Sequence, residues 1–90
     1  MLELAKLALR IMTDAFDAEI QMLIDDCVLE MNALGINVYG KGLEDAQIQS
    51  TIVAYLKWKF GDADNKDAFE HIYHDKIAQL MAMYKEGYAG

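Results

Sequence analysis

The sequence predicts an all-α fold, a small antiparallel helical bundle of three long helices preceded by a short N-terminal one. Apolar residues recur at helical spacing in four segments, and the 90 residues contain no proline. Glycine and polar clusters interrupt the pattern at intervals that leave only short loops, as in antiparallel bundles. We expect one domain over residues 1–90, with a modest core for a chain of this length.

The short first helix is expected at about 2–11, and the second at about 15–34. Thr13 or Asp14 can cap the second helix, and Asp14 and Asp17 place negative charge near its N-terminus. Gly35 is expected to end this helix as a left-handed C-cap, with Ile36 folding back on Met31. The apolar stripe of the second helix comprises Phe16, Ile20, Leu23, Ile24, Cys27, Val28, Met31 and Leu34.

The third and fourth helices are expected at about 44–60 and 66–85, after a loop at 36–43 and a turn at 61–65. No charged residue occurs between Asp45 and Lys57, which predicts that the third helix is central. The core positions expected from these patterns are Phe16, Ile20, Leu23, Cys27, Ile48, Ile52, Tyr55, Leu56, Ile72, Tyr73, Ile77 and Leu80.

The composition restricts the kind of partner. A net charge of −7 weighs against gripping nucleic acid, which requires clustered cations, and against docking on anionic membranes. No apolar run approaches a membrane span or a signal peptide, and the single cysteine cannot form an internal disulfide, so we expect an intracellular chain. The apolar content exceeds the roughly 45–50% of an ordinary soluble domain, which suggests a surface meant for a partner.

Catalytic and cofactor motifs are absent from the sequence. His71 and His74 have a metal-like spacing, but they lie opposite the apolar stripe of the fourth helix, where surface polar residues are expected. Cys27 lies on the apolar stripe of the second helix and is expected to be a buried small hydrophobe. We therefore expect no enzyme activity, no metal and no cofactor.

Two features of the second helix point to assembly. A second apolar stripe opposite the core comprises Ala15, Ala18, Met22, Leu29 and Ala33. One stripe suffices for folding, so Met22, Leu29 and Ala18 are candidates for contact with a neighbouring subunit, incidental exposure being the alternative. The helix region also carries six acids and no base, namely Asp14, Asp17, Glu19, Asp25, Asp26 and Glu30. A solvated face is the plain interpretation of this acidic run.

Several short segments along the chain carry a resemblance to a known family. They are Leu9-Arg10-Ile11, residues 16–20, Leu23-Ile24-Asp25, Leu34-Gly35-Ile36, Asp45, residues 48–55, Lys59-Phe60-Gly61, the Asp-Asn pair at 64–65, residues 73–77 and Leu80. In order and spacing, over about residues 4–84, the chain resembles the head–tail connectors of siphophages and their prophages. These are packing and cap positions and not a catalytic signature. Some connectors use a longer C-terminal extension against the portal, and we expect this chain to lack one.

The resemblance implies a small helical structural protein of the virion, of the kind often called a DNA packaging protein. Such proteins assemble in the host cytoplasm and form a ring under the portal at the head–tail junction. Tail-proximal head completion proteins then bind to this ring. DNA leaves the head through the ring, so an acidic lining would repel phosphates and let the duplex pass without tight binding. Candidates for such a lining are Asp17, Asp25, Asp26 and Glu30. The face formed by Met22, Leu29 and Ala18 would then contact either a neighbouring subunit or the portal.

Two other functions remain open from the residues alone. One is a small acidic interaction module outside a phage, such as a regulator or a chaperone subunit, which would not form a ring with portal-like symmetry. The other is an enzyme with a helical active site, which would require a buried polar cluster.

Overall fold

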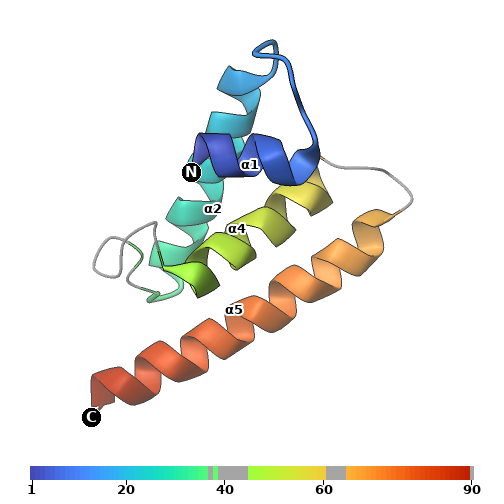
Figure 1. Ribbon diagram of the computed structural model, residues 1–90. Coiled ribbons are helices and arrows are strands. Elements are labelled where there is room, and N and C mark those ends of the chain that lie inside the picture. Colours follow the sequence, from blue (N-terminus) through green and yellow to red (C-terminus); the bar gives the residue numbers. More distant parts are fainter. Residues whose placement is uncertain (37, 39–44, 61–64, 90) are drawn as a thin grey trace.

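The chain is all-helical over the residues that the computed structural model describes, namely 1–36, 38, 45–60 and 65–89, with side chains as far as 83. The helices are α1 (Leu2–Leu9), α2 (Asp17–Ala33), α4 (Ala46–Lys59) and α5 (Lys66–Ala89) (Figure 1). The predicted fold class is therefore confirmed, with three long helices and a short first one. The predicted loop at 36–43 and turn at 61–65 lie mostly outside the described residues.

Helix α4 is central, as the absence of charge between Asp45 and Lys57 predicts. It packs against α1, α2 and α5, and its most extensive contact is with α5. Figure 1 shows α4 and α5 running antiparallel side by side, with α1 lying across α2 and α4. The last turns of α5 extend past the N-terminal end of α4 (Figure 1), because the two helices are antiparallel and α5 has 24 residues where α4 has 14.

The end of α2 confirms the predicted glycine cap. Gly35 has a φ of 92°, and its N–H donates to the Asn32 carbonyl at 3.0 Å. The Ile36 N–H donates to the Met31 carbonyl at 2.9 Å, and both Ile36 and Met31 are buried. These two hydrogen bonds and the apolar contact are those of a Schellman ending.

The start of α2 differs from the prediction. The helix begins at Asp17, and Phe16 holds the N-cap position without a side-chain cap. The Thr13 hydroxyl instead accepts the Ala15 N–H at 3.2 Å, and the Asp14 carboxylate pairs with a lysine from α1. Both predicted caps are therefore engaged in the turn that precedes the helix.

Helix α4 has a strong N-cap, which lies one residue after the predicted start of the helix at Glu44. The Asp45 carboxylate accepts the N–H groups of Gln47 at 2.9 Å and Ile48 at 3.2 Å. These bonds satisfy two of the donors that a helix N-terminus leaves free.

Helix α1 ends two residues earlier than predicted, at Leu9. Arg10 adopts a left-handed conformation with a φ of 59°. Its N–H donates to the Leu7 carbonyl at 3.1 Å, and the Ile11 N–H donates to the Lys6 carbonyl at 2.9 Å. This is the same ending as that of α2, made without glycine.

The core lies where the helical stripes predict it, with two exceptions. Phe16 and Ile72 were expected to be buried, but they are 44% and 40% exposed, so that prediction is wrong for both. Phe16 precedes the first turn of α2, and the ring of Phe60 packs against it edge-on at a centroid distance of 5.6 Å. Leu23 is partly buried. The remaining predicted core residues are buried, and they are Ile20, Cys27, Ile48, Ile52, Tyr55, Leu56, Tyr73, Ile77 and Leu80.

Candidate assembly surfaces

The outward face of α2 carries the predicted second apolar stripe. Met22 is 66% exposed and Leu29 is 63% exposed, and Ala18 lies exposed on the same side. The opposite face of the helix holds the buried residues Ile20 and Cys27. The stripe is therefore free of the chain's own core, while its contact with another chain stays a prediction.

Two exposed carboxylates border this stripe. Asp25 and Asp26 are about 100° apart around the helix, so one lies on each side of the stripe. The Gln21 amide donates to Asp25 Oδ1 at 3.0 Å. Neither carboxylate forms an ion pair with a residue that the structure describes.

The other two candidate channel acids have partners within the chain. Asp17 is half-buried, and its Oδ1 lies 2.9 Å from Lys6 Nζ. Glu30 accepts a hydrogen bond of 3.0 Å from the hydroxyl of Tyr73, a fully buried residue of α5. Of the four candidate channel acids, Asp17 and Glu30 thus have partners within the chain, whereas Asp25 and Asp26 are exposed beside the stripe.

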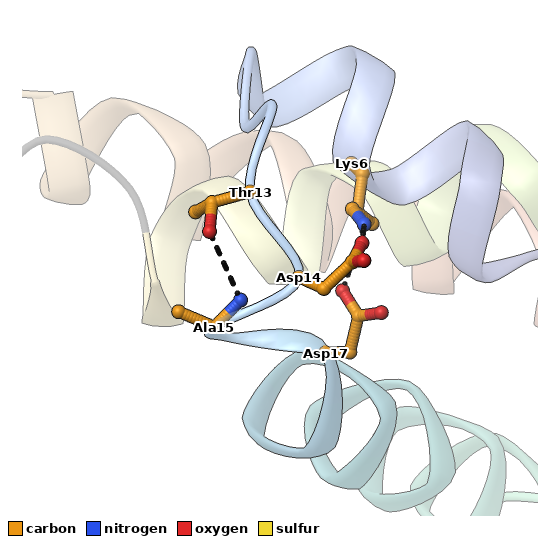
Figure 2. Close-up of polar contacts among 5 residues, drawn as sticks. All are labelled: Lys6, Thr13, Asp14, Ala15 and Asp17. Carbon is orange, nitrogen blue, oxygen red and sulfur yellow. Dashed lines mark hydrogen bonds and ion pairs between the residues drawn. The ribbon is translucent and has the colours of Figure 1, made fainter.

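Lys6 joins α1 to the turn before α2 (Figure 2). Its Nζ lies 2.6 Å from Asp14 Oδ1 and 2.9 Å from Asp17 Oδ1, and its side chain is only 10% exposed. The hydrogen bond from Lys6 lowers the pKa of Asp14. That bond raises the pKa of Lys6 in turn, and the close carboxylate of Asp17 acts in the same direction. The helical pattern of the sequence does not predict this contact, although Lys6 is the lysine that precedes the acidic run.

A groove with a volume of about 410 Å³ opens between α1, α4 and α5. Leu4 lines it from α1, while Phe69 and the exposed Ile72 line it from α5. The α4 side presents a mostly small or polar surface, namely Ala46, Gln49, Ser50, Val53, Ala54 and Lys57, and Lys76 of α5 completes the lining. The sequence pattern does not predict this groove, because one of its walls comes from α1, which is distant in the chain from α4 and α5.

The groove is apolar with a positive rim. Lys57 Nζ lies 5.3 Å from the centroid of the Phe69 ring, which holds the ammonium beside the apolar wall. Lys76 is a second cation of the lining, and the described part of the chain contributes no acid to it. Neither lysine pairs with an acid among the residues that the structure describes.

The family model for the phage connector protein matches residues 1–86. The chain belongs to the phage connector protein family. The match spans nearly all of the sequence and confirms the resemblance seen in its packing and cap residues. No significant match was found among curated proteins or among solved structures.

Connectors are structural proteins of the phage particle and not a catalytic family. The one thiol of this connector is poorly suited to nucleophilic chemistry. Cys27 is fully buried, and burial raises its pKa to about 12, with the Glu30 charge acting in the same direction and the Tyr73 hydroxyl against it. Nucleophilic attack requires the thiolate, which this environment disfavours.

The histidines of this connector lie on the exposed side of α5, as predicted. His74 Nε2 is 3.8 Å from Glu70 Oε2, and the His74 ring packs near Trp58 and Tyr73 at centroid distances of 5.7 and 5.5 Å. Within the described residues, the structure brings together no three His, Cys, Asp or Glu side chains suited to hold a metal. The helices in that part of the chain also include none that is long and apolar enough to span a bilayer.

Proposed function

We propose that this connector docks under the portal as a ring at the head–tail junction and forms part of the DNA conduit after packaging. The observation that carries the proposal is the family match over residues 1–86. Its partners would be further copies of itself and the portal, and then the tail-proximal head completion proteins. Assembly would take place in the cytoplasm of the bacterial host.

The exposed face of α2 supports the proposal. A subunit of a ring requires apolar surface beyond its own core, and Met22 and Leu29 supply it on the outside of a helix that is already packed. Changing both to Asp should leave the monomer folded, because neither side chain belongs to the core. The double variant should fail to complete heads, whereas a double Asp variant at Ala68 and Ala78, which are exposed on α5, should complete them.

The charge of the chain supports passage of DNA without retention. A protein that holds duplex DNA neutralises phosphates with several cations and loses affinity steeply as salt rises. This connector has 8 Lys and Arg against 15 Asp and Glu. We expect no appreciable duplex binding by the isolated chain at physiological salt, and tight, salt-sensitive binding would contradict the conduit.

The test of the proposed function uses the phage that carries this gene. Deleting the gene should yield heads that package DNA but do not join tails, and adding the purified protein should restore joining. Electron microscopy should then show a ring of this chain against the portal. Deletion heads that join tails with normal yield would refute the role.

The same system decides whether Asp25 and Asp26 line the channel. If they do, changing both to Lys leaves rings and tails intact but slows DNA ejection, because the new cations attract phosphate. If they instead contact a neighbouring subunit, the same change blocks assembly. Asp17 and Glu30 are less suited to this test, since each already has a partner within the chain.

A further inference from the structure

Two exposed surfaces of the chain differ in shape. The outward stripe of α2, formed by Ala18, Met22 and Leu29, is a convex ridge. The groove between α1, α4 and α5 is concave, and no residue of α2 lines it. The ridge and the groove therefore belong to separate surfaces of one chain, so both can be occupied at once.

The ridge is short enough to fit within the length of the groove. Met22 and Leu29 are seven residues apart, which is about 10 Å along a helix axis. The groove follows α4 from Ala46 to Lys57, about 16 Å by the same rise per residue. Both apolar side chains of the ridge can therefore enter one groove, as an amphipathic helix does when it binds in an apolar channel.

The two surfaces also have opposite charge. Asp25 and Asp26 border the ridge, and Lys57 and Lys76 line the groove. No base lies on α2, and no acid lines the groove among the residues that the structure describes. Charges so arranged contribute to the rate and register of docking more than to its affinity, and they disfavour contact of two ridges or of two grooves.

We propose that α2 of one copy docks in the groove of the next copy, with Met22 and Leu29 against Phe69 and the carboxylates toward the two lysines. Because a ridge meets a groove, the contact is heterologous, and repeating it generates a closed ring or an open filament. The inference rests on the proposed function, since it names the contact that would build the ring. It also places Asp25 and Asp26 between subunits and not in the channel.

Sedimentation of the full-length chain over a wide concentration range tests the contact directly. The wild type should associate beyond the dimer as its concentration rises. The ridge variant Asp25→Lys/Asp26→Lys and the groove variant Lys57→Glu/Lys76→Glu should each associate at least tenfold more weakly. Asp67→Lys/Asp75→Lys is the matched control, because it changes the net charge by as much as the ridge variant on exposed positions outside both surfaces.

Mixing the ridge variant with the groove variant should restore association, because the Lys-bearing ridge of one then meets the Glu-bearing groove of the other. One chain with all four changes should also self-associate again. These two rescues require that the ridge binds the groove, and no contact between two like surfaces produces them. Circular dichroism confirms that each variant remains folded.

Several outcomes would overturn the inference. They are a wild type that stays monomeric at every concentration, a groove variant that associates like the wild type, and a mixture without rescue. Binding of the portal protein to the groove, with self-association unchanged in the groove variant, would assign the groove to the portal. In each case, a ring of this chain seen in tailed heads would leave the proposed function intact. Tailed heads without such a ring would refute the proposed function, whatever the result for the ridge and the groove.

Discussion

The hydrogen bond between Tyr73 and Glu30 ties α5 to α2, and its two ends should respond differently to mutation. Tyr73 is fully buried, whereas Glu30 is an exposed residue whose carboxylate accepts from the Tyr73 hydroxyl at 3.0 Å. Changing Glu30 to Ala leaves a buried phenol without this acceptor. Changing Tyr73 to Phe leaves a carboxylate that water can reach.

The magnitudes follow from this asymmetry. A buried donor left without its partner costs about 1–3 kcal/mol, while loss of a hydrogen bond whose other partner is rehydrated costs about 0.5–1.5 kcal/mol. Glu30→Ala should therefore lower the free energy of unfolding more than Tyr73→Phe. The double variant should lose less than the sum of the two, because the second change removes a group that the first has already left without its partner.

Urea unfolding followed by circular dichroism at one low protein concentration measures all three variants, and a fixed concentration prevents self-association from altering the result. Asp26→Ala is the control on the same helix and should change stability by less than about 0.5 kcal/mol, as exposed positions do. A Glu30→Ala variant that loses less stability than Tyr73→Phe, or two losses that simply add, would show that the hydroxyl does not depend on this carboxylate.

Three further predictions concern stability. Ile52→Ala should lower the free energy of unfolding by about 2–5 kcal/mol in urea, because the side chain is fully buried in α4, and a loss below about 0.5 kcal/mol would contradict this packing. Arg10→Gly should raise it by about 0.5–1 kcal/mol, since the left-handed conformation strains every residue but glycine, and a loss would be contrary to that geometry. Stability should fall from about pH 9 to pH 12 by up to about 1.4 kcal/mol per pH unit from Cys27, because the unfolded thiol loses its proton first while burial holds the folded pKa near 12. Cys27→Ala should remove this part of the slope, which stands alone below about pH 10, whereas above that pH burial also raises the pKa of Tyr73 and adds a slope of the same sign. An unchanged slope between about pH 9 and pH 10 would exclude the thiol as its source.

The fold was predictable where a single residue type settles the local geometry. Gly35 ends α2 because glycine reaches a φ of 92° without strain, and the pattern of Met31 and Ile36 completes the ending. The end of α1 was not predictable in this way. Arg10 makes the same turn with a side chain that opposes it, so tertiary packing and not residue preference fixes the boundary.

The candidate surfaces likewise include features that helical spacing predicts and features that it does not. Helical spacing alone predicts the exposure of Met22 and Leu29, since both lie opposite a complete core stripe. It cannot predict that Ile72 leaves the core, because the stripe of α5 is wider than the surface that α4 offers to cover it. Lys6 was missed for a related reason, since its two carboxylates approach it only after the chain turns between α1 and α2.

The central position of α4 has a consequence for hydrogen exchange. Its amides are covered by α1, α2 and α5 together, so deuterium should reach them only when the whole bundle opens. Helix α1 has eight residues, too few to persist alone in water, and the last turns of α5 extend past α4 (Figure 1). These two ends should take up deuterium through local opening, well before α4 does. A partner chain that docks against either end should therefore slow deuterium uptake at that end and leave uptake at α4 unchanged.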